Sequence, residues 1–260
     1  MQAINVTNLT VSYDRNPVLE NVSFTIPNGS ITGIIGPNGA GKSTLIKSIL
    51  RLIPSNSGEV EVYGKPYGQQ KQLIGYVPQR SEVDWDFPTN ALDVVLMGRY
   101  RHIGMFKRAG KAEVAWAKEC LKKVGMQDYA QRQISQLSGG QQQRVFLARA
   151  LAQDAMVYFM DEPFSGVDAA TERAIIELMK KWKQEGKTVI VVHHDLQTAE
   201  DYFDHILLLN KQTIDFGETK KVFTLENLEK AYGGKIAFLQ RTPSTAKEPT
   251  AHGSLSYQPE

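Results

Sequence analysis

Residues 36–44 form a glycine-rich run that ends in lysine, serine and threonine, and this run has the clearest chemistry in the sequence. It fits the pattern G-x-x-x-x-G-K-S, in which glycines let consecutive backbone N–H groups point inward at phosphate oxygens. An apolar run precedes it and apolar residues at helical spacing follow it, so it lies between a predicted strand and a predicted helix, as the motif requires. We therefore predict that nucleotide phosphates bind to Gly36, Pro37, Asn38, Gly39, Ala40, Gly41, Lys42, Ser43 and Thr44.

Two side chains of this loop have distinct predicted roles. Lys42 is placed to reach the β- and γ-phosphates, and the hydroxyl group of Ser43 is placed to ligate Mg²⁺. The helix that begins here adds the positive end of its dipole. The alternative is a glycine-rich turn that only caps a helix, and the matching strand and helix on either side argue against it.

Three apolar runs of strand length end in polar side chains. These side chains are Gln79, Asp161, Glu162 and His194. A single glutamine or histidine in such a place is more often structural, but the ends of several strands in an open α/β sheet gather around one site. Asp161 fits a Mg²⁺ ligand that acts through water, and Glu162 fits the group that orients or deprotonates an attacking water.

A second candidate anion site precedes another predicted helix. Ser138 is a natural N-cap, and Gly139, Gly140 and Gln141 follow it at the start of a regular helical stretch. The serine could merely cap the helix, or the free N–H groups of this first turn could bind an anion. Two anion sites in one chain require two phosphates, or one nucleotide held between two chains.

The composition is that of a globular protein. The chain has 260 residues, of which 42% are hydrophobic and 22% charged, and its net charge of +2 gives no reason to expect a nucleic acid partner. A single cysteine, Cys120, excludes an intramolecular disulfide. The amino terminus lacks the pattern of a secretory signal, and no stretch approaches about 18 consecutive apolar residues. We therefore expect a cytoplasmic protein that is peripheral to any membrane it serves.

The elements that position these residues change along the chain. Alternating residues at 3–35 predict antiparallel strands, and 59–63 with 74–77 predict a further strand pair. Helical spacing at about 81–152 predicts a helical subdomain inserted into the sheet. Residues 241–260 are polar and predict a disordered tail after a domain that spans 1–240.

Taken together, these motifs resemble those of the ATP-binding subunit of ABC transporters, over about residues 3–238. Residues 36–44 match the family's phosphate loop, and Leu137–Gln141 matches its defining signature without a change. Val157–Glu162 matches the strand that carries the magnesium aspartate and the catalytic glutamate. Ser165–Asp168 reads Ser-Gly-Val-Asp where the family usually has Ser-Ala-Leu-Asp, a loop that crosses the dimer interface.

Three single residues extend the resemblance. Gln79 matches the glutamine that senses magnesium and faces the membrane subunit, and Tyr13 matches the aromatic residue that stacks on adenine. His194 matches the switch histidine, whereas His193 stands where the family more often has threonine. From the residues alone, a strand aromatic packed on its sheet is the slightly favoured explanation of Tyr13, and the resemblance reverses this preference.

The resemblance implies a fold, two ligands and several partners. The fold is α/β, a P-loop ATPase core with an antiparallel β subdomain and an inserted α-helical subdomain. Two copies pair head to tail around ATP and Mg²⁺, so that Ser138, Gly140 and Gln141 of one copy contact the γ-phosphate bound by the other, with Asp168 beside them. The implied partners are an integral membrane permease at the cytoplasmic face of the membrane and, indirectly, an extracytoplasmic metal-binding protein.

Finer features favour one branch of the family. Residues 81–88, 95–99 and 162–172 look like those of importers of manganese, zinc or iron, closest to the manganese branch. An importer of siderophores or cobalamin is the alternative. A DNA-repair ATPase of the superfamily would carry a long coiled coil between the two motifs, and no sustained heptads occur there. A translation-factor ATPase would carry a second phosphate loop, and the intact Glu162 and His194 argue against a regulator that does not hydrolyse ATP.

Overall fold

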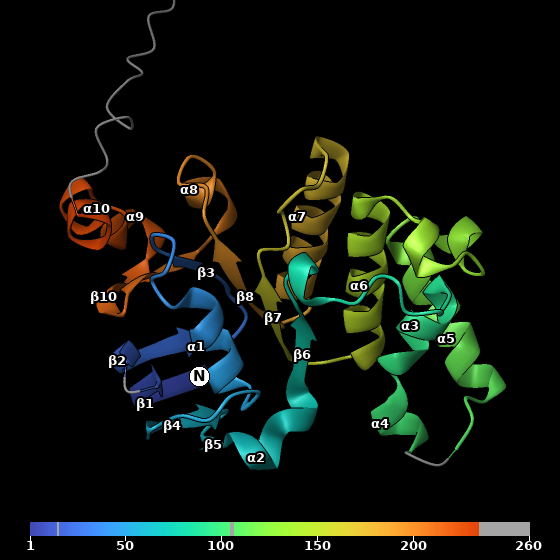
Figure 1. Cartoon of the computed structure of the whole chain (residues 1–260), viewed down its shortest axis with the longest axis horizontal. Coiled ribbons are helices and arrows are strands. Elements are labelled where there is room, and N and C mark those ends of the chain that lie inside the picture. Colours follow the sequence, from blue (N-terminus) through green and yellow to red (C-terminus); the bar gives the residue numbers. More distant parts are fainter. Residues whose placement is uncertain (15, 105–106, 234–260) are drawn as a thin grey trace, which may run out of the picture.

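The computed structural model describes residues 1–14, 16–104 and 107–233, which form two β-sheets and a group of helices (Figure 1). The first sheet is antiparallel, in the order β2 (Asn16–Pro27), β1 (Gln2–Tyr13), β4 (Ser57–Val62), β5 (Lys65–Pro66). The second sheet has the order β10 (Gln212–Glu218), β9 (His205–Asn210), β3 (Ile31–Ile35), β8 (Thr188–His193), β7 (Val157–Asp161), β6 (Ile74–Val77). Its strands are parallel except β10, which pairs antiparallel with β9.

The central strands of the second sheet are buried on both faces. Every residue of β3, β7 and β8 is buried, which explains why these strands are apolar runs in the sequence rather than alternating ones. Successive side chains of β7 point to opposite faces, so Val157 and Phe159 join the core shared with the antiparallel sheet, while Tyr158 and Met160 join the core under the helices. The sheet therefore lies between two hydrophobic cores, one on each of its faces.

The helices fall on both sides of this sheet. Helix α1 (Lys42–Ile49) packs between the two sheets through Leu45, Ile46 and Ile49. The chain between β6 and β7 forms a helical group apart from β1 and β2 (Figure 1). Its helices are α3 (Ala91–Met97), α4 (Tyr100–Ile103), α5 (Lys111–Lys123) and α6 (Gly139–Gln153). The other helices are α2 (Tyr67–Gln70), α7 (Ala169–Gln184), α8 (Ala199–Tyr202), α9 (Thr219–Val222) and α10 (Leu225–Tyr232), and 3-10 turns occur at Lys71–Leu73, Arg80–Glu82, Gln127–Tyr129 and Ile134–Gln136.

Two expectations about the strands are wrong. Residues 31–35, which lie in the segment expected to be antiparallel, form β3, which pairs in parallel with β8 and β9. Residues 59–63 and 74–77 do not pair, because β4 joins β1 in the antiparallel sheet and β6 joins β7 in the other. The two segments are neighbours in the sequence, but each finds its partner far along the chain. The predicted tail, 241–260, lies outside the described residues. Among the described helices, none combines the length and the apolar composition that crossing a bilayer requires.

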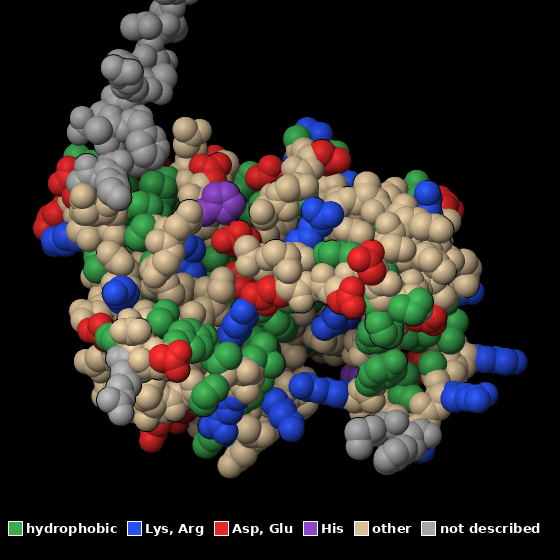
Figure 2. Space-filling view, viewed as in Figure 1, with side chains coloured by type: hydrophobic (Ala, Val, Ile, Leu, Met, Phe, Trp, Pro, Cys, Tyr) green, Lys and Arg blue, Asp and Glu red, His purple; other side chains and the backbone are tan. Residues whose placement is uncertain are grey.

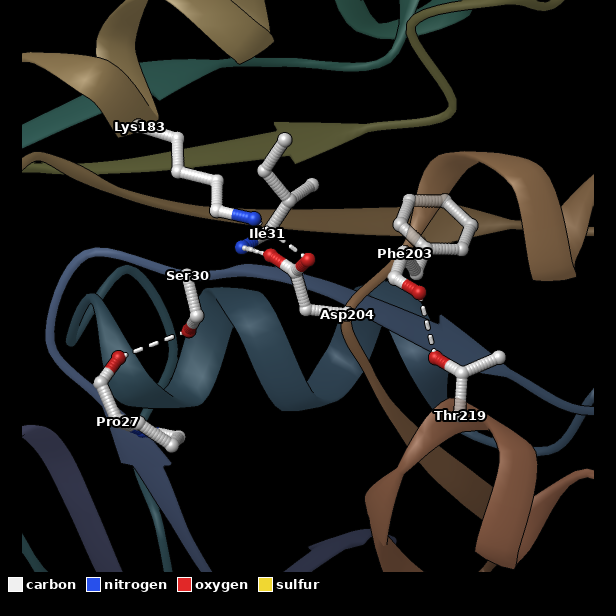
Figure 3. A network of polar contacts seen from close by, with 7 residues as sticks. All are labelled: Pro27, Ser30, Ile31, Lys183, Phe203, Asp204 and Thr219. Atoms are coloured by element: carbon white, nitrogen blue, oxygen red, sulfur yellow. Dashed lines mark hydrogen bonds and ion pairs between the residues drawn. The ribbon is translucent and has the colours of Figure 1, made fainter.

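A polar network fixes the start of β3, the strand that leads into the glycine loop (Figure 3). Asp204 accepts hydrogen bonds from the backbone N–H of Ile31 (2.9 Å) and from Lys183 of α7 (2.6 Å). The hydroxyl group of Thr219, at the start of α9, donates to the carbonyl oxygen of Phe203 (2.6 Å). The network therefore joins β3, α7, β9 and α9 at the end of the sheet opposite the glycine loop.

Candidate nucleotide-binding site

The glycine loop has a backbone course that needs glycine at two positions. A Cβ atom at Gly36 would lie 2.0 Å from the carbonyl oxygen of Leu209 in β9, so no other residue fits there without a shift of the backbone. Gly41 is the N-cap of α1 and has a φ of 93°, in the left-handed region that other residues rarely adopt. The loop thus lies close to the sheet and turns sharply into the helix.

A cavity of about 580 Å³ opens at this loop and brings together residues from distant parts of the chain. It is lined by Asn38, Gly39, Ala40, Gly41, Lys42, Ser43, Thr44, Gln79, Glu162, Ser165 and His194. The convergence predicted from the strand ends is therefore present in the structure, at the carboxyl ends of β3, β6, β7 and β8. Ser165 is an addition, because the sequence placed it only in a loop of the dimer interface.

Lys42 carries a cation that is largely removed from water. Its side chain is 7% exposed, and its ammonium group donates to the carbonyl oxygens of Gly36 (2.8 Å) and Pro37 (2.9 Å). Burial lowers its pKa, and the carboxylates of Glu162 and Asp161 oppose this shift. A desolvated ammonium group held by a glycine-rich loop at the start of a helix is suited to bind a polyanion such as a chain of phosphates.

Ser43 and Asp161 form a pair that fits a hard cation. The Ser43 hydroxyl donates to Oδ1 of Asp161 (3.0 Å), and Oδ2 of the same carboxyl group is buried with no hydrogen-bond partner among the described residues. Burial raises the pKa of Asp161 to about 6, against the opposing effect of the hydrogen bond from Ser43. Because a buried carboxylate oxygen without a partner is costly, this donor set fits Mg²⁺, which prefers carboxylate and hydroxyl oxygens with water.

Glu162 is aimed by a sharp turn at the end of β7. Its φ of 48° lies in the left-handed region, which costs a residue with a side chain roughly 1–2 kcal/mol. Its Oε2 accepts a hydrogen bond from Nε2 of Gln79 (3.0 Å), so the side chains that follow β6 and β7 meet in the cavity. Strain of this kind concentrates at functional sites.

The two consecutive histidines differ in position. His194 is exposed and lines the cavity, whereas His193 is 3% exposed and its ring packs edge-on against Phe164 (5.4 Å) and Phe203 (5.3 Å). Nε2 of His193 is 2.8 Å from the hydroxyl oxygen of Thr198. The structure therefore places His194, and not His193, where a nucleotide could reach it.

The buried His193 should make stability depend on pH. Burial lowers its pKa from 6.5 to about 4, so the folded chain takes up this proton at lower pH than the unfolded chain does. The contribution of the neutral, buried His193 to the free energy of unfolding is therefore fully present above pH 6.5. It is lost as the pH falls toward 4, by at most about 3 kcal/mol. Urea unfolding of wild type and His193→Phe at several pH values measures this, and parallel pH profiles for the two proteins would contradict it.

The remaining predicted residues lie outside the cavity of the single chain. Ser138 caps α6 and forms a capping box with Gln141, in which Ser138 N–H donates to Oε1 of Gln141 (2.9 Å) and Gln141 N–H to the serine oxygen (3.4 Å). Asp168 caps α7 by accepting from Thr171 N–H (2.6 Å), and Tyr13 is 48% exposed at the end of β1. Gly139 and Gly140 lie in the first turn of α6.

Comparisons with known proteins agree with this site. A family model described as ABC transporter matches residues 19–165. The manganese transport system ATP-binding protein MntB of Bacillus subtilis is 65% identical over 240 residues, which cover 92% of this chain and 96% of MntB. The zinc transport system ATP-binding protein TroB of Treponema pallidum is 55% identical over 256 residues, which cover 97% of this chain and 96% of TroB.

Solved structures extend the likeness to the fold. A dimeric post-hydrolysis state of an ATP-binding cassette, bound to ADP and Pi, superposes with a TM-score of 0.73 at 31% identity, over 83% of this chain and 98% of the other. The ADP conformation of an ATP-binding cassette of an ABC transporter gives a TM-score of 0.75 at 26% identity, over 90% of this chain and all (100%) of the other. The α/β arrangement with its antiparallel and helical parts is common to this group.

Proposed function

Because this chain belongs to the ABC transporter family of ATP-binding subunits, we propose that two copies bind and hydrolyse ATP between them to power import of a divalent metal ion, manganese first, through a membrane permease. One observation carries the ATPase part of the proposal: the phosphate loop, Glu162, Gln79 and His194 line one cavity. The metal is supported by the relatives, since MntB is named for manganese transport and TroB for zinc transport.

Each residue of the cavity has a role in this reaction. The loop at 36–44 and Lys42 hold the phosphates, and His194 contacts the γ-phosphate. Glu162 orients the attacking water and accepts its proton, while the hydrogen bond from Gln79 fixes the direction of the Glu162 carboxylate. The protein's contribution is positioning and charge stabilisation.

The magnesium ion would be held by Ser43 and Asp161, with Gln79 beside them. The orphaned Oδ2 of Asp161 supports this, as does the Ser43 hydroxyl 3.0 Å from Oδ1. Because Nε2 of Gln79 donates to Glu162, its amide oxygen is the atom that would face the ion. When bound, Mg²⁺ neutralises charge on the β- and γ-phosphates.

Head-to-tail pairing gives the remaining residues their partner. Ser138, Gly139, Gly140 and Gln141 would contact the γ-phosphate bound to the other copy, Tyr13 would stack on the adenine of its own copy, and Asp168 would lie at the interface. The position of the first turn of α6 outside the single-chain cavity supports this arrangement. The dimeric state of the solved cassette bound to ADP and Pi is a further support.

The membrane partners follow from the transport role. The permease would meet the surface near Gln79 and the helices after it, so that the chain is peripheral at the cytoplasmic face. An extracytoplasmic metal-binding protein would deliver the cargo to the permease. No residue of this chain is expected to select the metal.

The metal is tested by cellular metal content in a strain whose only copy carries Glu162→Gln. We expect manganese to fall selectively, because uptake loses its energy source while expression of the protein is retained. A selective fall in zinc or iron would keep the importer and correct the metal. Unchanged metal content, with ATPase activity verified in the wild-type protein, would contradict metal import and leave only the ATPase.

A further inference from the structure

Arg80 directly follows Gln79, but its side chain contacts the helical group instead of the cavity. Its guanidinium group donates through Nη2 (3.1 Å) and Nε (3.4 Å) to the same atom, Oε1 of Gln142 in α6. Gln142 is 4% exposed, and its amide nitrogen donates to the carbonyl oxygen of Ile134 (3.1 Å). Arg80 therefore contacts a buried side chain whose amide oxygen and amide nitrogen both form hydrogen bonds.

The same guanidinium group lies against the backbone of the first turn of α6. A Cβ atom at Gly139 would lie 3.0 Å from Cζ of Arg80 and 3.1 and 3.2 Å from its two terminal nitrogens. The group is thus packed flat over the glycine, one residue after the N-cap Ser138. The absence of a side chain at Gly139 therefore leaves room for the arginine.

Trp85 contacts both the backbone and the side chain of Arg80. Its indole N–H donates to the carbonyl oxygen of Arg80 (2.8 Å), and its ring lies 5.9 Å from Cζ of Arg80. The Trp85 ring also packs on Phe146 of α6, with centroids 5.0 Å apart. The segment 79–85 is therefore attached to α6 at two points, while Gln79 holds Glu162 of the core.

We propose that Arg80 is a positioning residue that holds the first turn of α6 in the orientation in which it receives the nucleotide bound to the second copy. The inference rests on the proposed head-to-tail pairing. Two adjacent residues would then position the two halves of the composite site. Gln79 would orient the catalytic carboxylate of its own copy, and Arg80 would orient the turn that closes over the nucleotide of the other copy. Arg80 does not line the cavity of the single chain, so it acts through its contacts with Gln142 and Gly139.

The chemistry of the contact requires arginine in particular. A planar guanidinium group can donate two N–H groups to one acceptor and lie flat on a peptide backbone at the same time, whereas a lysine ammonium group is a compact point charge. Arg80→Lys should therefore keep the charge near the turn and lose the geometry. This separates positioning from a general electrostatic attraction for phosphate.

The test measures ATP-driven dimerisation in a Glu162→Gln background, by sedimentation over a range of protein concentrations. We expect Arg80→Ala and Arg80→Lys to weaken the dimer about tenfold, because a charge-assisted contact that orders the interface is lost. Affinity of the single chain for a fluorescent ATP analogue should stay unchanged, and the melting temperature should fall only modestly, because Arg80→Ala leaves Oε1 of Gln142 without this donor. Arg132→Ala is the matched control, since this exposed arginine of the helical group lies over the Tyr129 ring and its side chain forms no hydrogen bond or ion pair among the described residues.

Each alternative result would overturn a specific part of the proposal. If the Glu162→Gln parent does not dimerise with ATP, the proposed pairing fails and this inference with it. If the parent dimerises and Arg80→Ala dimerises equally well, only the positioning role is wrong. Full recovery in Arg80→Lys would show that charge alone matters, and an equal loss of affinity of the single chain for the ATP analogue would show a general structural role.

A double-mutant cycle with Gln142→Met checks the route of the effect. If Arg80 acts through Gln142, the two substitutions should weaken dimerisation together by little more than either does alone. Effects that multiply would mean that the two side chains act independently, and would overturn the route through Gln142.

Discussion

Glu162→Gln is expected to reduce steady-state ATP hydrolysis by about 10²–10⁴-fold while leaving ATP binding intact. The amide has the shape of the carboxylate but cannot accept the proton of an attacking water. Glu162 is not a phosphate ligand in our assignment, so the affinity for ATP should change little. Because hydrolysis would no longer reopen the pair, an ATP-bound dimer should accumulate, and phosphate release together with light scattering measures both effects.

The matched control for this prediction is Glu177→Gln, which neutralises an exposed carboxylate on α7 away from the cavity. It should hydrolyse ATP at the wild-type rate. If Glu162→Gln retained a rate within about tenfold of wild type, then Glu162 could not be the general base, since that contribution is larger. The assignment would then pass to water alone or to another group in the cavity.

Most residues of the candidate site could be predicted because they belong to motifs that span only a few positions of the sequence. The glycine loop carries its own context of strand, turn and helix, and Gln79, Glu162 and His194 follow apolar runs. Strands buried on both faces leave a strong signal, because β7 is apolar up to Asp161 and β8 is apolar from Val189 to Val192. The expected fold, that of the ABC ATPase family, is confirmed by the matching family model and solved structures.

Contacts between distant segments left no such signal. Whether β4 joins β1 or β6 depends on competing partners far along the chain, and the alternating pattern of residues 59–63 fits either. The bond between Arg80 and Gln142 spans 62 positions, and neither residue belongs to a motif on its own. Only its place next to Gln79 could have drawn attention to Arg80.

Lys42→Ala is expected to weaken ATP binding by about 1.5–3 kcal/mol, the usual worth of a hydrogen bond to a charged group. The ammonium group is already desolvated, so part of the cost of burying a charge beside the phosphates is met before ATP binds. Both Lys42→Ala and Lys42→Met would leave the carbonyl oxygens of Gly36 and Pro37 without their donor, and Lys42→Met, which keeps an apolar stem, controls for the side-chain packing that alanine would also lose. Calorimetric titration with ATP measures the affinities.

The comparison between nucleotides locates the contact. If Lys42 reaches the β- and γ-phosphates, Lys42→Met should lose more affinity for ATP than for AMP, which has neither phosphate. Lys111→Ala, at the exposed start of α5, is the control and should bind both as wild type does. An equal loss for ATP and AMP would mean that Lys42 supports the loop as a whole, and unchanged ATP affinity would mean that it touches no phosphate. The Lys42 ammonium group bonds two carbonyl oxygens of the loop and could therefore support the loop without touching phosphate. An equal loss of affinity for ATP and AMP is thus the outcome that the Lys42→Met comparison must exclude.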